Sequence, residues 1–311
     1  MMLGKRIILG AAILSVGLSA QTWAHDPPDL LIPAAQFPPG AEPVIDGNPV
    51  EWGPIPVETY GSVGELLYPV GAATREGRVL ENASQGDINP ADFQITHKLG
   101  WSPTTNGFYI LTEVFDDLHF IGRPDPARFW LDDSVEYGLN FKHQSSEDQT
   151  FNDGDIVTLQ KYKFAYPPLE GEWQFYEPQG NLPWLTSGTK WFDIGITFEG
   201  EEFGESTYFY ELRIRPIAEM PNSESATEDQ AVEGILQEGM IIHWGNMISD
   251  TDEGGTEDQK RETQWSTSPS GAAANGTTDV LLSPVDPGIE FVEQQTAVEA
   301  TSWARVKAQY R

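Results

Sequence analysis

Aromatic and acidic side chains stand next to each other in residues 128–140, where Trp130 precedes Asp132 and Asp133. Trp130 offers a flat apolar plate, and Glu136, a little further along, offers a hydrogen-bond acceptor. Together they would form a recognition surface for a small polar ligand. The alternative is that Trp130 caps a core and that the two aspartates are solvated turn residues.

A strand is predicted to hold this surface. The apolar residues Val135, Tyr137 and Leu139 occur at every second position, which is the period of a strand with one face toward a core. Glu136 falls between them and is therefore expected on the opposite face. Trp130 belongs to the turn that leads into this strand.

Carboxylates also gather where strands are predicted to end, which is typical of a cation site built from oxygen ligands. One group combines Asp116 and Asp117, which follow the strand-like run 108–115, with Asp132 and Asp133, which lie shortly before Val135. A second group, 250–253, begins like an EF-hand loop but carries Arg261 at the twelfth position. For each group the alternative is a solvated acidic turn. Calcium is the expected ion, and the candidate ligands are Asp116, Asp117, Asp132, Asp133, Asp250 and Asp252.

No pattern of catalytic residues is found. With 48 acidic residues in the chain, a pair of carboxylates suited to glycoside hydrolysis arises by chance and carries no information. No Gly-x-Ser-x-Gly elbow, phosphate-binding loop or dinucleotide-binding glycine pattern occurs. The histidines show no spacing that pairs them with each other or with a carboxylate, so we expect structural or solvated roles for them. They are His25, His97, His119, His143 and His243. The chain is therefore predicted to bind a ligand and not to be an enzyme.

The formal net charge is −30 at pH 7, from 48 acidic and 18 basic residues. Such a surface repels phosphate backbones and anionic membranes, so we expect no nucleic-acid partner. A saline or calcium-rich habitat would explain most of this acidity. Because the chain has no cysteine, its stability must come from a hydrophobic core and not from disulfides.

The first residues have the pattern of an export signal. Lys5 and Arg6 precede the apolar run 7–20, which is shorter than a membrane span. We expect cleavage after Ala24 and a secreted or periplasmic protein. No later stretch approaches about 20 apolar residues, so no membrane insertion is expected after cleavage.

Short β-prone runs follow, separated by Gly, Pro, Asn and Asp, and no long amphipathic helix interrupts them. This pattern predicts an all-β protein, an antiparallel β-sandwich of two sheets of the jelly-roll or immunoglobulin-like kind. Residues 44–48 read as a strand end and turn. The other predicted strands are 93–99, 108–115, the strand that contains Glu136, 156–165, 191–198, 208–216, 240–248 and 278–282.

Two insertions and a tail complete the predicted organisation. The insertion 167–190 carries several aromatic residues that either fold onto the sandwich or offer stacking surfaces. The insertion 222–239 includes a predicted short helix at 231–236. Apolar residues at helical spacing in 296–310 predict a short C-terminal helix that packs back or contacts a cell-surface or enzyme partner. The predicted parts are a signal peptide, 1–24, an N-terminal extension, 25–39, the sandwich, 40–287, and a tail, 288–311.

The order of these segments along the chain resembles that of the family 9 carbohydrate-binding modules. The resemblance covers about residues 40–285, apart from the two insertions, and rests on the order of its segments. It implies a β-sandwich, bound calcium, and sugar binding as a non-catalytic accessory of secreted polysaccharide-degrading enzymes. The segments that carry it are Ile45-Asp46-Gly47, Trp52, Trp101, 109–117, Trp130-Leu-Asp-Asp-Ser-Val-Glu136, 208–216 and 241–255.

The resemblance assigns the sugar site only in part. In the family a sugar lies between two tryptophans and hydrogen bonds to a glutamate; Trp130 matches the first tryptophan and Glu136 the glutamate. The loop of the second tryptophan, 266–277 here, has no aromatic residue, and Met247 replaces a glutamine. The second wall would come from the end of the preceding strand or from the aromatic insertion. The candidates for this wall are Trp265, Trp173 and Trp184.

Three functions remain open at this stage. The first is a secreted carbohydrate-binding protein that assists extracellular polysaccharide degradation. The second is a structural or cell-surface sandwich that keeps the fold and has lost the sugar site. The third is a haem-carrying cytochrome-type relative, for which Met247 and one of His243, His143 or Lys161 would be the axial ligands.

Overall fold

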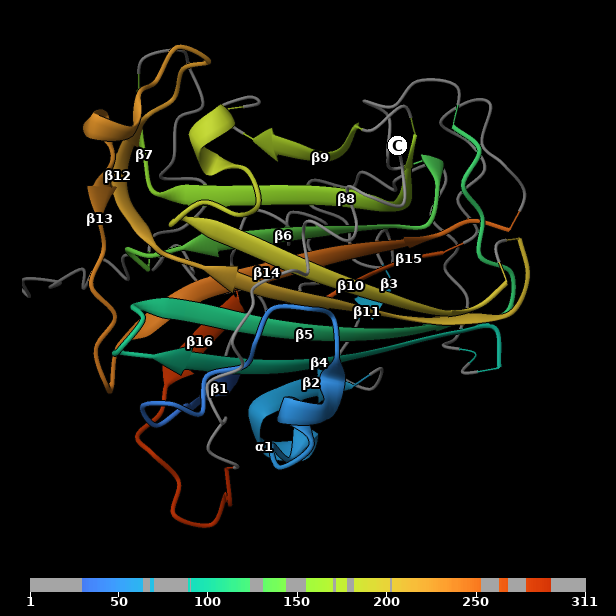
Figure 1. Ribbon diagram of the computed structural model, residues 1–311, viewed down its shortest axis with the longest axis horizontal. Coiled ribbons are helices and arrows are strands. Elements are labelled where there is room, and N and C mark those ends of the chain that lie inside the picture. The colour runs from blue at the N-terminus through green and yellow to red at the C-terminus, as the bar shows by residue number, and fades with distance from the viewer. Residues whose placement is uncertain are drawn as a thin grey trace, which may run out of the picture.

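The computed structural model describes residues 30–63, 68–69, 89, 91–123, 131–143, 155–169, 172–177, 182–201, 203–252, 263–267 and 278–291 (Figure 1). For 62–63, 68–69, 167–169, 172–177 and 263 the description covers the backbone alone. The predicted signal peptide, 1–24, and the predicted terminal helix, 296–310, lie outside the described residues.

The described elements are mainly strands that form two large layers. One layer contains β10 (Phe192–Gly200), β11 (Ser206–Ile214), β5 (Gly107–Asp116), β4 (Phe93–Ser102) and β2 (Gly61–Val63). The other contains β16 (Thr278–Leu282), β14 (Ile241–Asp250), β6 (Ser134–Asn140), β8 (Leu159–Leu169), β9 (Glu172–Glu177), β15 (Thr263–Ser266) and β3 (Tyr68–Pro69). The fold is therefore an all-β sandwich.

Strand β1 (Leu31–Gln36) connects the two layers. It pairs in parallel with β16 through Leu31 and Ile32, and in parallel with β4 through Ala35 and Gln36. The other ladders of the two layers are antiparallel, so β1 closes the sandwich along one edge. Residues 31–36, expected in an N-terminal extension, are thus part of the sheet.

The main core lies between the layers, where aromatic rings of β8 meet those of β10. Tyr162 and Phe192 stack with ring centroids 4.0 Å apart, and Phe164 packs against Phe192 at 5.9 Å. Within β11, Tyr210, Leu212 and Ile214 face this core, as the alternation in the sequence predicts. Burial of these large side chains provides most of the hydrophobic stabilisation.

The predicted hairpin between β4 and β5 is confirmed, with a continuous antiparallel register from Phe93↔Asp116 to Ser102↔Gly107. The strands predicted at 191–198, 208–216, 240–248 and 278–282 are also present, as β10, β11, β14 and β16. The run 156–165 divides into β7 (Ile156–Val157), which pairs with β12 (Ile217–Pro221), and β8. Residues 44–48 form a turn, and β1 ends well before it, at Gln36.

A smaller core lies between the outer face of the first layer and the segment that contains the 3-10 helix η1 (Pro49–Trp52) and α1 (Val57–Tyr60). Helix α1 is at the bottom of Figure 1. The buried Glu211 of β11 accepts hydrogen bonds from Trp52 Nε1 at 2.8 Å and from Gly47 N at 2.9 Å. Burial raises the pKa of Glu211 to about 8. Gly47 has φ +83, and a Cβ there would lie 2.5 Å from the backbone of Ile196, so this turn requires glycine.

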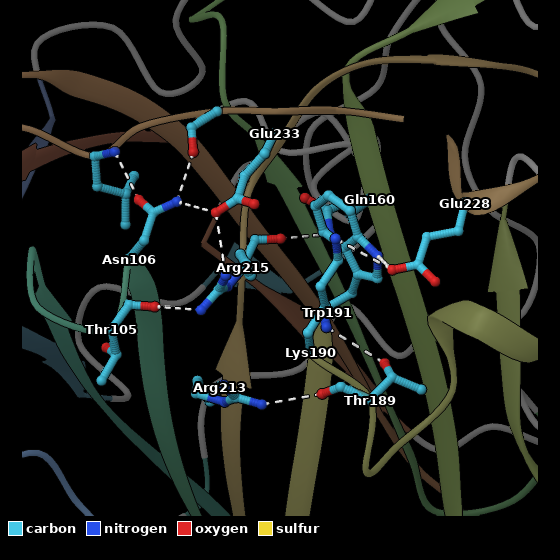
Figure 2. Close-up of polar contacts among 12 residues, drawn as sticks. Thr105, Asn106, Gln160, Thr189, Lys190, Trp191, Arg213, Arg215, Glu228 and Glu233 are labelled. Atoms are coloured by element: carbon cyan, nitrogen blue, oxygen red, sulfur yellow. Dashed lines mark hydrogen bonds and ion pairs between the residues drawn. The ribbon is translucent and has the colours of Figure 1, made fainter. Parts of the chain in front are cut away.

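Polar contacts attach the insertion 222–239, and Arg215 that precedes it, to the turn between β4 and β5 (Figure 2). Asn106 Nδ2 donates to Glu233 Oε1 at 2.7 Å, and Arg215 Nη2 donates to Thr105 O at 3.0 Å. Lys190 Nζ lies 3.1 Å from Glu228 Oε1, and this ion pair joins the two insertions to each other. Trp191 Nε1 donates to the same oxygen at 3.1 Å. Trp184, whose side chain is described in the segment 182–190, packs against the main core of the sandwich.

The helix predicted at 231–236 is wrong. The short 3-10 helix η7 (Glu228–Gln230) precedes it, and β13 (Val232–Glu233) pairs with β12 in a small sheet with β7 (left in Figure 1). The strand is favoured because Glu233 is fixed in an extended segment by Asn106 and Arg215. Among the described residues, no helix has the length and apolar character needed to cross a membrane.

Candidate functional site

Seven acidic and imidazole side chains meet at one end of the sandwich, and we call them the acidic centre: Asp92, Asp116, Asp117, His119, Asp133, Asp250 and Asp252. They come from the segment before β4, the end of β5, the segment before β6 and the end of β14. The two acidic groups predicted separately from the sequence are thus parts of one site. Antiparallel pairing puts these strand ends at the same edge of the sandwich.

Three carboxylates of the acidic centre are buried together. Asp116, Asp133 and Asp250 are 0%, 1% and 2% exposed. Burial, together with the neighbouring Asp116 and Asp250, raises the pKa of Asp133 well above its usual range. Asp133 is nevertheless anchored, because it accepts hydrogen bonds from Thr251 N at 2.7 Å and from Phe120 N. Such a concentration of buried negative charge requires a compensating proton or cation.

His119 points into this group of carboxylates. Its Nε2 lies 2.7 Å from Tyr166 O, and since a carbonyl only accepts, Nε2 must carry the proton. Its buried Nδ1 lies 3.7 Å from Asp116 Oδ2 and 3.4 Å from Asp133 Oδ2, without a hydrogen bond to either. A neutral ring would face these oxygens with a lone pair. A bound cation would remove this repulsion.

Two further triads of the acidic centre consist of carboxylates alone. Asp116, Asp250 and Asp252 can each place an oxygen within 4.8 Å of the others, and the same holds for Asp92, Asp117 and Asp252. Asp252 belongs to both triads, so a bridging carboxylate would connect two neighbouring ions. Ligand sets made of oxygen atoms favour hard cations such as calcium over softer metals. The residues of the acidic centre therefore fit calcium chemically.

Asp132, predicted as a metal ligand, has a different role. It forms an ion pair with Arg123, and its Oδ1 accepts from Gly122 N at 2.9 Å and Arg123 N at 2.8 Å. Burial raises its pKa, and these contacts oppose that change. The carboxylate closes the turn at residues 120–123, which explains why it lies outside the described triads of the acidic centre.

Glu136 lies on the outer face of the second layer, as predicted from the alternation along β6. Its neighbours Val135, Tyr137 and Leu139 belong to the main core. Lys161 Nζ and Lys163 Nζ, on the adjacent strand β8, each lie 3.6 Å from Glu136 Oε2. We call these three residues the Glu136 group. It combines a hydrogen-bond acceptor with two charged donors, which is what a sugar hydroxyl can use in both roles.

Met247 of β14 is the cross-strand neighbour of Glu136, and Lys163 is its neighbour on the other side. Met247 and Lys161, both named as possible haem ligands, therefore share the outer face. His243 and His143 lie further along the sheet, against Asp279. This arrangement brings the histidines to a carboxylate and not to Met247.

The predicted aromatic walls are not gathered around Glu136 in the described part of the structure. Trp130 lies outside the described residues, and Trp173 belongs to β9, whose side chains are not described. Trp184 packs against Trp191 at 6.0 Å and donates Nε1 to Ala226 O at 2.9 Å. Trp265 is 4% exposed in the main core, because it pairs with the core residue Ile248 and so faces away from Glu136.

Sequence reasoning missed two members of the acidic centre. His119 stands three residues after Asp116, and the turn between them directs the ring back toward the carboxylate. Asp92 precedes the first residue of β4, and its backbone accepts a hydrogen bond from Asp117 N at 3.0 Å. The first signal is the Asp-Asp-x-His spacing after a strand, which contradicts the expectation that no histidine is spaced for a carboxylate. The second signal is an acidic residue just before the first strand of the same hairpin, which antiparallel pairing places beside the end of the second strand.

Two solved structures of a family 9 carbohydrate-binding module from Caldicellulosiruptor kristjanssonii are similar to this chain. The complex with cellotriose is 14% identical, with a TM-score of 0.47, over 85% of this chain and 99% of that chain. The complex with glucose is 14% identical, with a TM-score of 0.46, over 83% and 97%. No protein-family model and no curated protein matches the chain.

Proposed function

We propose that the protein is a secreted, non-catalytic carbohydrate-binding protein that assists extracellular polysaccharide degradation. The observation that carries this proposal is the Glu136 group, a carboxylate and two ammonium groups on one face of a rigid sheet, where the side chain of Lys161 is 15% exposed and those of Glu136 and Lys163 are buried. The predicted turn with Trp130 leads directly into the same strand. An indole beside such a group would stack on the apolar face of a sugar while the charges bind its hydroxyls.

Retention on insoluble polysaccharide tests the proposal. Purified protein is incubated with cellulose and with xylan, and the affinity for soluble cello-oligosaccharides is then measured by titration calorimetry. We expect Trp130→Ala and Glu136→Gln each to weaken binding at least about tenfold, a loss of ~1.4 kcal/mol. Trp173→Ala, in the same assay, tests whether the insertion 167–190 supplies the second aromatic wall of the sugar site.

The matched control is Glu238→Gln, which removes an exposed carboxylate far along the chain from β6. It should bind like the unmodified protein. Binding that survives both Trp130→Ala and Glu136→Gln would place the site elsewhere. If no glycan is retained by a correctly folded protein, the sandwich is structural, which is the second function left open by the sequence.

We also propose that the acidic centre binds calcium and that this supports the fold. The observation that favours it is the burial of Asp116, Asp133 and Asp250 around the unpaired Nδ1 of His119. A divalent ion held by the two carboxylate triads would offset this charge. Because the ligands come from four separate segments, the ion would tie strand ends of both layers together.

A further inference from the structure

A second cluster of metal-binding side chains lies at the other end of β14, and we call it the histidine cluster: His143, His243 and Asp279. His143 Nε2 and His243 Nε2 are each 3.0 Å from Asp279 Oδ1. All three can place a ligand atom within 4.8 Å of the others. The acidic centre is reached from His243 by following β14 to Asp250, which is about 23 Å at a strand's rise per residue.

The backbone holds the histidine cluster in place. His243 and Asp279 are direct cross-strand partners in the ladder between β14 and β16, so their side chains leave the same face. His143 follows the end of β6 and has φ +50, a conformation uncommon outside glycine. This turn brings the His143 ring to within 4.4 Å of the His243 ring, measured between centroids. A strained residue held against a rigid ladder is typical of a functional position.

The distances within the histidine cluster suit three ligands of one metal ion. Ligand atoms about 3 Å apart occupy neighbouring positions around an ion with bonds of about 2.1 Å. Neutral imidazole is the form that binds a metal.

The chemical nature of the ligands selects the class of ion. Two imidazole nitrogens and one carboxylate oxygen suit zinc and its first-row neighbours, whereas calcium and magnesium prefer oxygen ligands. Access is available, because the side chains of His143 and Asp279 are 32% and 14% exposed while His243 is buried. An ion could thus enter from solvent and keep one or more positions for water or a ligand.

We propose that the histidine cluster is a binding site for a divalent transition metal of the zinc class, separate from the acidic centre. The metal joins the turn after β6 to the ladder between β14 and β16. This inference uses residues that the sugar and calcium proposals do not involve, so the proposals can fail independently.

Zinc titration of the calcium-saturated protein tests the site. Untagged protein with His25→Ala, which prevents a terminal histidine from competing, is stripped with EDTA and dialysed into excess calcium at about pH 7.5. Calorimetry should then show one tight zinc site per chain. His143→Gln and Asp279→Asn should each weaken zinc binding at least about 100-fold. Cobalt in the same site should give visible absorption bands that disappear in His143→Gln.

Glu219→Gln is the matched control, since it removes an exposed carboxylate that pairs with Lys142, next to His143. It should bind zinc like the parent protein. His143 lies partly in solvent, so His143→Gln should keep the fold, which circular dichroism verifies. A parent protein without a zinc site under these conditions overturns the proposal. So does zinc affinity that is unchanged in both His143→Gln and Asp279→Asn, because the contacts of the two histidines with Asp279 would then serve the fold alone.

Discussion

His97 lies between the two layers, fully buried, with its ring against Tyr137 and Trp244. Asn246 Oδ1 accepts from Thr267 N, so its amide nitrogen faces His97 Nε2 and donates to it. His97 Nδ1 therefore carries the proton and donates to Thr112 Oγ1 at 2.8 Å. A second proton on this ring would meet the amide hydrogens of Asn246.

Acid should destabilise the protein through this residue. Burial lowers the pKa of His97 to about 3, against an ordinary value of 6.5. Below pH 6.5 the unfolded chain takes up a proton that the folded chain refuses, so stability is lost as the pH falls toward 3. The loss due to His97 is ~2 kcal/mol at pH 5 relative to pH 7.5.

Urea unfolding of the parent and of His97→Gln at pH 7.5 and pH 5 measures this effect. The variant should be less stable at pH 7.5 by about 1–3 kcal/mol, since it disturbs buried hydrogen bonds. The difference in unfolding free energy between the two proteins should narrow or close at pH 5, because only the parent loses stability through His97. Carboxylate titrations are common to both proteins and cancel. A gap of equal size at the two pH values would mean that His97 does not titrate in this range.

For a single residue, the sequence predicts the sheet face on which its side chain lies better than it predicts which residues that side chain contacts. The alternation along β6 places Glu136 on the outer face correctly, since a period of two needs no tertiary information. Its contacts with Lys161 and Lys163 depend on the register between β6 and β8, which single residues do not encode. The same holds for Trp265, whose face is set by pairing with Ile248.

The acidic centre connects the ends of several strands, so bound calcium should stabilise the folded protein against unfolding. EDTA should lower the melting temperature, and calcium at 100 times its Kd should restore about 2.7 kcal/mol, or roughly 5–10 °C. Asp252→Asn should remove most of this response because Asp252 belongs to both carboxylate triads. Differential scanning calorimetry with EDTA and with calcium provides the measurement.

The control for this experiment is Asp229→Asn, an exposed acidic residue in η7. It changes the net charge equally and should leave the calcium response intact. Equal melting temperatures with EDTA and with calcium in the parent protein would rule out a stabilising ion.

Most strands could be predicted from the sequence, but the order of the strands could not. The hairpin of β4 and β5 has a local signal, because a polar turn with glycine separates two β-prone runs. The strand β13 lacks such a signal: its two residues are extended because Arg215, which follows β11, and Asn106 in the turn between β4 and β5 hold Glu233. Short elements of this kind depend on tertiary contacts, which override local preference.

The whole molecule carries a formal charge of −30, which opposes its compact state. Salt screens such repulsion, with a Debye length of about 30 Å at 0.01 M and about 3 Å at 1 M. In saturating calcium, we expect the melting temperature to rise by roughly 3–10 °C between 20 mM and 500 mM sodium chloride.

A charge-reduced variant serves as the comparison. Replacing the exposed residues Glu199, Glu201, Asp229 and Glu238 by their amides removes four negative charges without touching the acidic centre. Its melting temperature should depend less on salt than that of the parent. A parent whose stability falls with added salt would show that attractive ion pairs outweigh the net repulsion.

The double pairing of β1 has a consequence for the order in which the protein can form. Leu31 is among the first described residues, while its partner Asp279 belongs to the last strand. A chain that is synthesised from its N-terminus must therefore carry β1 unpaired on the β16 side until nearly all other described strands have emerged. Contacts this distant in sequence close late and slowly. Completion of the sandwich is thus a final event, and an interrupted chain would keep an open edge.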